Sequence, residues 1–175
     1  AVEDAVDAYR ALLRDGGSPQ RIAIIGDSAG GGLALATALR LRTLGEPLPA
    51  ALVVFSPWVD LGNPDRGVVP AGEVMLTPAW TKECARLYLA GSDSSDPLAS
   101  PIRGELHGLP PTLLQVGQDE WLLSDARRLR AALATAGVPV ELQEYPRRWH
   151  VFQANAGVLA DANRALDSVA RFLRE

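Results

Sequence analysis

The sequence has few of the residues that disulfide scaffolds, metal centres and nucleic-acid-binding surfaces need. Its 175 residues include one cysteine, Cys84, and two histidines, too few for an internal disulfide or for a metal-ligand cluster with the usual spacing. Seventeen basic side chains against 21 acidic ones give a net charge of −4, which leaves no positive excess to neutralise phosphates. No apolar run approaches the roughly 18 to 20 residues of a membrane span. We therefore expect no cofactor, no nucleic-acid partner and no membrane span, and the single thiol favours a reducing, cytoplasmic compartment.

What remains is the composition of a globular protein, with 47% hydrophobic and 22% charged residues and a length that suits one α/β domain. Amphipathic stretches predict helices over residues 2–13, 29–44, 78–89, 124–136 and 160–173. Short apolar runs predict strands over residues 21–25, 51–55, 112–116 and 140–145, the last with the alternation of an edge strand. Alternating helices and strands indicate a mainly parallel, doubly wound sheet flanked by helices.

One stretch interrupts this alternation. Residues 60–101 are rich in glycine, proline, serine and aspartate and contain a single helical segment. The usual connection has only about two to six residues, so this stretch is either disordered or a functional insert. We favour a lid-like insert within a single domain that covers residues 1–175.

The most informative motif is G-D-S-A-G at residues 26–30, a G-x-S-x-G placed between a predicted strand and a predicted helix. In this context the small residues permit a sharp, strained turn that exposes the Ser28 hydroxyl. The following helix N-terminus favours negative charge on the oxygen, and the Ala29 backbone N–H is a candidate oxyanion donor. A phosphate-binding loop is excluded, because Gly32 and Leu33 stand where Lys and Ser or Thr are required.

A serine nucleophile needs a base and an acid that orients it. His107 lies in a loop before the third strand, where a surface role is expected. His150 follows the fourth strand, at the sheet edge where ligands bind in α/β folds, and is the candidate general base. The loop after the third strand offers Asp119 and Glu120 as candidate acids. The next carboxylate, Asp125, is instead explained as a first-turn residue of a helix capped by Ser124.

The candidate substrate contacts are less specific. Trp58 follows the second strand and Trp149 precedes His150, so both are placed at the same sheet edge. Asp27 and Val151 flank the candidate nucleophile and base and complete this set of predicted binding residues. Apolar residues of the insert, such as Trp80 and Tyr88, fit either an acyl pocket or simple packing.

Together, five motifs resemble the hormone-sensitive-lipase-like branch of the α/β hydrolases, which contains many bacterial carboxylesterases: GDSAGGGLA, SPWVD, DPLASP, GQDEWLLSD and WHVF. The resemblance covers nearly the whole chain and implies hydrolysis of short-chain carboxylic esters through an acyl-enzyme on Ser28. In that family, the loop that carries the triad acid has the pattern Asp or Glu, any residue, Leu, any residue, acidic residue. This alignment selects Glu120 over Asp119, with Ser124 replacing the second acid.

The sequence also departs from that family. An H-G-G-G loop that donates oxyanion hydrogen bonds, expected before the G-x-S-x-G motif, is not in this sequence. We therefore expect an N-terminally incomplete hydrolase domain with weak activity on its own, since one missing donor costs about 10²- to 10³-fold in rate. We also expect a homodimer, a second chain or a further segment to cover the strand at residues 21–25. By analogy alone, dimerisation would use residues 140–145 and 160–173.

Two alternatives stay open. The chain is a non-catalytic ligand-binding remnant of the same fold, or a peptidase or thioesterase that uses the same triad. The presence of His150 argues against the first, because the non-catalytic receptor of this family has lost its triad histidine. Peptidases of this fold usually carry a large extra domain that this sequence lacks.

Overall fold

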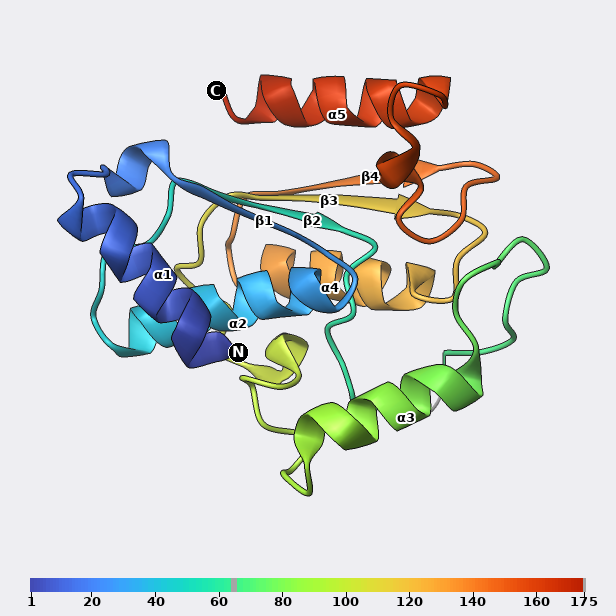
Figure 1. The fold of residues 1–175 in the computed structure, drawn as a ribbon, viewed down its shortest axis with the longest axis horizontal. Helices are drawn as coiled ribbons and strands as arrows, with labels where there is room; N and C mark the ends of the chain where they lie inside the picture. The colour runs from blue at the N-terminus through green and yellow to red at the C-terminus, as the bar shows by residue number, and fades with distance from the viewer. Residues whose placement is uncertain (64–65, 175) are drawn as a thin grey trace.

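The computed structural model describes residues 1–63 and 66–174. Pro64 and Asp65, which belong to the predicted insert, lie outside the described residues. In the described part, four strands form one parallel sheet in the order β1-β2-β3-β4 (Figure 1). Their bounds are β1 (Ala23–Asp27), β2 (Ala51–Phe55), β3 (Thr112–Gly117) and β4 (Val140–Tyr145).

The register of this sheet brings the carboxyl ends of all four strands to one edge. Asp27 pairs with Phe55, Phe55 with Gln115, and Gly117 with Tyr145. Ligand sites in open α/β sheets lie outside this edge, because the loops that follow each strand meet there.

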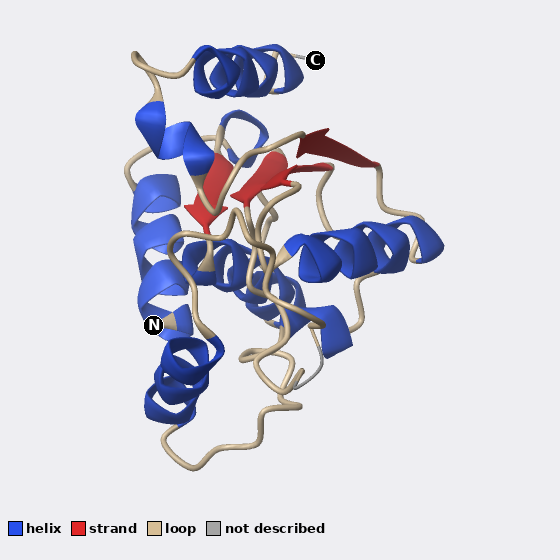
Figure 2. Cartoon of the chain, turned by 90° about the vertical axis from the view of Figure 1, so that its right-hand side faces the viewer, coloured by secondary structure: helices blue, strands red, loops and turns tan. Residues whose placement is uncertain are grey.

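Helices cover both faces of the sheet. The α-helices of the described chain are α1 (Val2–Arg14), α2 (Ala29–Thr43), α3 (Pro78–Leu89), α4 (Leu123–Thr135) and α5 (Ala160–Phe172). Figures 1 and 2 show α5 on one face and α2 and α4 on the other. In the described part of the chain, none of these helices combines the length and hydropathy that crossing a membrane requires.

The core follows from this layering. Leu35 of α2, Leu52 of β2 and Leu129 of α4 belong to the main hydrophobic cluster, while Val53, Leu113 and Val169 form a smaller cluster beneath α5. Side chains of β2 therefore pack on both faces, as expected of a strand inside a parallel sheet. Helix α2 is apolar on nearly all sides because it packs against both the sheet and α1.

The observed elements match the predicted ones closely, with two corrections. Strand β1 begins two residues later than predicted, because Pro19–Arg21 form a 3-10 helix that begins with proline. The second correction concerns the cap of α4. This helix begins at Leu123 without a side-chain cap, and the buried Ser124 hydroxyl lies inside its first turn.

The insert at residues 60–101 is anchored to the rest of the fold at its described residues. Asp60 is fully buried and forms ion pairs with Arg103 and Arg128. The guanidinium of Arg66 lies 5.8 Å from the ring centroid of Trp58 and 5.6 Å from that of Trp121. Helix α3 has the predicted bounds. The function of the insert as a lid stays a prediction.

Candidate active site

The turn after β1 consists of one residue, Ser28, because β1 ends at Asp27 and α2 begins at Ala29. Ser28 has φ 53° and ψ −120°, a strained conformation for a residue with a side chain. Two hydrogen bonds to the next strand and its loop hold the turn. The Ser28 N–H donates to the Phe55 carbonyl at 2.8 Å, and the Ser28 carbonyl accepts from the Trp58 N–H at 2.9 Å.

Glycines permit this turn because backbone atoms come too close for a side chain. A Cβ on Gly26 would lie 2.2 Å from the Gly30 carbonyl oxygen, and one on Gly32 would lie 2.3 Å from the Trp58 carbonyl oxygen. A Cβ on Gly30 would meet no atom within 4 Å. The first glycine of the motif is thus sterically required, whereas the second is not.

The structure brings Ser28, His150 and Glu120 into one hydrogen-bonded chain. His150 Nε2 lies 2.8 Å from Ser28 Oγ, and His150 Nδ1 lies 2.9 Å from Glu120 Oε2. His150 is 2% exposed and Glu120 1% exposed. A carboxylate accepts but cannot donate, so Nδ1 carries the hydrogen and Nε2 accepts the hydroxyl proton of Ser28. This is the geometry of a nucleophile, a base and an acid that orients the base.

One hydrogen bond to the loop that carries His150 and one within the acid loop itself hold Glu120 in place. The Asp119 N–H donates to the Arg148 carbonyl at 3.0 Å, and the Gly117 N–H donates to Glu120 Oε1. A Cβ on Gly117 would lie 2.1 Å from the Arg148 carbonyl oxygen. Only glycine therefore allows the two loops to pack this closely at the end of β3.

The other carboxylates of this loop lie elsewhere. Asp119 is half-buried, and its side chain occupies the space beside Gly72 of the insert. Asp125 is fully buried in the first turn of α4 and forms an ion pair with Arg66 at 3.2 Å. Burial raises the pKa of Asp125, and the nearby Arg66 guanidinium only partly offsets this effect.

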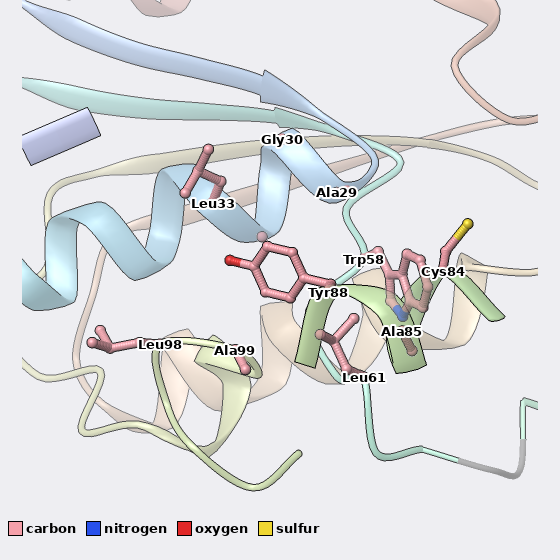
Figure 3. Close-up of a pocket in the computed structure, with 11 residues that line it drawn as sticks. Ala29, Gly30, Leu33, Trp58, Leu61, Cys84, Ala85, Tyr88, Leu98 and Ala99 are labelled. Carbon is pink, nitrogen blue, oxygen red and sulfur yellow. The ribbon is translucent and has the colours of Figure 1, made fainter. Parts of the chain in front are cut away.

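An apolar cavity of about 300 Å³ opens beside the Ser28 turn (Figure 3). Its walls include Ala29 and Gly30 from the start of α2, Trp58 from the loop after β2, and Ala85 and Tyr88 from α3. The cavity thus joins the backbone immediately after Ser28 to the insert. Among the described residues, no three His, Cys, Asp or Glu side chains come together where they could share a metal ion.

The predicted binding residues occupy different surroundings. Trp58 lines the cavity, whereas Trp149 packs with the cluster of Phe152, Ala162 and Ala165. Asp27 is exposed at the end of β1, and Val151 has φ 52° directly after His150. The binding roles of all four residues stay predictions. The second histidine, His107, is exposed in its loop, consistent with the expected surface position.

Ser56 also belongs to this region. It is the first residue of the motif SPWVD, but it is not among the predicted site residues. It is fully buried at the end of β2, and its hydroxyl donates to Glu120 Oε1 at 2.8 Å. The available signal was its position directly after a buried strand, at the same sheet edge as Ser28. A buried serine there needs hydrogen-bond partners, and the loops beside it supply them.

Comparison with known proteins agrees with this architecture. Residues 1–154 match the model of a family described as alpha/beta hydrolase fold. An acetyl-hydrolase of Streptomyces hygroscopicus is 48% identical over an alignment 176 residues long, which covers 99% of this chain and 59% of that protein. An esterase of Acinetobacter venetianus is 36% identical over an alignment 175 residues long, which covers 98% of this chain and 58% of that protein.

A solved structure gives the same result in three dimensions. An esterase from the bacterial hormone-sensitive lipase family superposes with a TM-score of 0.94 at 43% identity, over 99% of this chain and 59% of that one. The chain therefore spans somewhat less than three fifths of the length of these relatives. It belongs to the alpha/beta hydrolase fold family, in the branch that resembles hormone-sensitive lipase.

Proposed function

We propose that this chain carries the nucleophile, base and acid of a serine esterase that cleaves short-chain carboxylic esters. Ser28 Oγ attacks the ester carbonyl carbon while His150 Nε2 takes its proton. His150 then returns that proton to the departing alcohol oxygen, which leaves an acyl group on Ser28. A water molecule then attacks the acyl group in the same way, with His150 as the base, and the carboxylic acid product leaves as the Ser28 hydroxyl is restored. Glu120 keeps the imidazole in the required tautomer and stabilises the imidazolium.

The observation that carries this proposal is the hydrogen-bonded chain from Ser28 Oγ through His150 to Glu120, with distances of 2.8 and 2.9 Å. The names of the relatives, acetyl-hydrolase and esterase, support the ester class. The Ala29 N–H is the proposed oxyanion donor, at the positive end of α2. The adjoining apolar cavity is the proposed site for the acyl group, with Trp58 as one wall. Asp27, Trp149 and Val151 are proposed to contact the rest of the substrate.

Further proposals concern the surroundings of the chain. Strand β1 forms one edge of the sheet, and its residue Ile25 is 50% exposed. An exposed apolar edge invites pairing, so we propose that a second copy, another chain or a further segment covers β1. The insert at residues 60–101 is proposed to act as a lid. A cytoplasmic location is proposed because a single thiol, Cys84, suits a reducing compartment.

The experiment compares the chain with its Ser28→Ala variant on p-nitrophenyl acetate and on matched thioester and amide substrates. Ser124→Ala is the matched control, because it removes another serine hydroxyl, one that has no hydrogen-bond partner in the structure. We expect the unmodified chain and Ser124→Ala to hydrolyse the ester and to be labelled by a serine-directed fluorophosphonate. Ser28→Ala should show neither turnover nor labelling. A folded chain that shows neither turnover nor labelling would refute the proposal, and preferred cleavage of the thioester or amide would change the substrate class.

A further inference from the structure

Ser56 occupies the point in the sheet where the loops carrying the three site residues meet. Strand β2 lies between β1, which leads to Ser28, and β3, which leads to Glu120. Ser56 follows β2 directly, and its N–H donates to the Gln115 carbonyl of β3 at 2.8 Å. Its side chain is 0% exposed. No bulk water therefore reaches the hydroxyl, and protein groups must satisfy it.

Both bonds of the Ser56 hydroxyl have a fixed direction. The oxygen accepts from the Val151 N–H at 3.0 Å, because a backbone N–H can only donate. Its single proton goes to Glu120 Oε1 at 2.8 Å, because a carboxylate can only accept. The hydroxyl thus joins the acid to the residue that follows His150.

Both ends of this connection have unusual backbone conformations. Ser56 has φ 47° and Val151 has φ 52°, values that residues with a side chain seldom adopt. Glycine would relieve the strain at position 56 but would lack the hydroxyl. Such conformations persist only where surrounding contacts hold them. The bonds of Ser56 to Val151 and Glu120 are contacts of this kind.

We propose that Ser56 is a positioning residue that aligns the Glu120 carboxylate and the His150 imidazole with each other, an inference that rests on the proposed function. Glu120 Oε1 is occupied by Ser56 and by the Gly117 N–H, which leaves Oε2 for His150 Nδ1. The same hydroxyl holds the backbone after His150, so the imidazole and its acid cannot shift independently. The Ser56 hydroxyl bonds to Glu120 and Val151 rather than to Ser28, and Ser56 does not line the cavity, so its effect passes through these two partners.

The kinetic test uses Ser56→Ala and Ser56→Gly. We expect kcat to fall by about 10- to 100-fold in both, since small misalignments of reacting groups have effects of this size. KM should change little, because Ser56 lies outside the cavity. Thr112→Val is the matched control. It also removes a fully buried hydroxyl with a hydrogen bond, to the Pro110 carbonyl at 2.9 Å, but at the opposite end of β3. A purely structural role of Ser56 predicts equal kinetic effects in the variants and the control.

A second measurement does not depend on turnover. The Nδ1 proton of His150, held by Glu120, should give a far-downfield proton resonance that persists in His107→Gln, where the only other histidine is removed. We expect this resonance to move or broaden in Ser56→Ala and Ser56→Gly and to stay in place in Thr112→Val. An unchanged resonance in the Ser56 variants, or no such resonance in the unmodified chain, overturns the proposal.

The two measurements separate this inference from the proposed function. If the unmodified chain and Ser28→Ala hydrolyse no ester while the resonance responds to Ser56, the esterase proposal fails in this chain and the positioning role stands. If ester turnover depends on Ser28 while kcat and the resonance are the same in all Ser56 variants, the esterase stands and the positioning role is refuted.

Discussion

Replacing Gly26 with alanine is the sharpest steric test of the Ser28 turn. The new Cβ would lie 2.2 Å from the Gly30 carbonyl oxygen and 2.4 Å from its carbon. Both are backbone atoms, so no side-chain rotation can relieve the contact. The first turn of α2 must move away from β1, and Ser28, which joins the two elements, must move with it.

The size of the effect follows from these distances. Real Cβ contacts stay at or above 3.0 Å, so the backbone must retreat by about 0.8 Å. The same displacement along the bond from Ser28 Oγ to His150 Nε2, now 2.8 Å, would lengthen it to about 3.6 Å, beyond hydrogen-bond range. We expect kcat to fall on the order of 10²-fold. Overpacking should also lower the free energy of unfolding by about 1–3 kcal/mol.

The assay combines p-nitrophenyl acetate hydrolysis with urea unfolding. Gly30→Ala is the matched control for stability, because a Cβ there meets no atom within 4 Å and the residue lies in the first turn of α2. Alanine is the better helix former by about 1 kcal/mol, so this variant should unfold at the same or a higher urea concentration. A Gly26→Ala variant with unchanged kcat and unfolding midpoint would refute the steric reasoning.

Further predictions concern the acid, a buried ion pair and the cavity. Glu120→Gln should lower kcat by about 10³- to 10⁴-fold through the wrong imidazole tautomer, while Asp119→Asn keeps kcat near that of the unmodified chain; the reverse pattern would exchange the two assignments. Burial raises the pKa of Asp60, but hydrogen bonds from its two arginine partners outweigh this and bring it below the ordinary 3.8. Asp60→Asn should therefore reduce the free energy of unfolding by about 1–3 kcal/mol at pH 7. This loss should shrink as the pH falls below 3.8 and through the folded-state pKa of Asp60. A difference in urea unfolding between Asp60→Asn and the unmodified protein that does not change with pH would contradict this prediction. Tyr88→Ala widens the cavity and should raise kcat/KM for p-nitrophenyl butyrate relative to the acetate by up to about 15-fold, because butyrate has two more methylenes at ~0.8 kcal/mol each; an unchanged ratio places the acyl group elsewhere.

Much of the fold could be predicted because its signals are local. Strands β2 and β4 and helix α3 have the predicted bounds, since apolar runs or helical periodicity end at clear breaks. The shift in β1 has a local cause as well, because Pro19 begins a 3-10 turn that delays the strand. The predicted cap of α4 was wrong, because the helix begins one residue before Ser124 and its N-cap position is Leu122, a buried residue of a hydrophobic cluster that makes no side-chain cap bond.

The site was predictable in its position but not in its contacts. Asp119 and Glu120 are neighbours in one turn, so spacing alone fits both, and the resemblance to a family chose between them. In the structure, packing of Gly117 against the His150 loop directs the Glu120 carboxylate to the imidazole. The sequence did not predict a role for Ser56, because its two hydroxyl partners are 64 and 95 residues away along the chain. No local pattern carries contacts of that kind.

The order of the four strands has a consequence for how such a site is assembled. Ser28 follows β1, Ser56 follows β2, Glu120 follows β3 and His150 follows β4, so each strand contributes one member of a continuous hydrogen-bonded chain. No pair of strands contains the set. A sheet that lacks β1 loses Ser28 from one end of the hydrogen-bonded chain, and a sheet that lacks β4 loses His150 from its middle. During refolding, the hydrogen-bonded series from Ser28 to Ser56 therefore forms only when the last strand joins the sheet, later than collapse or helix formation.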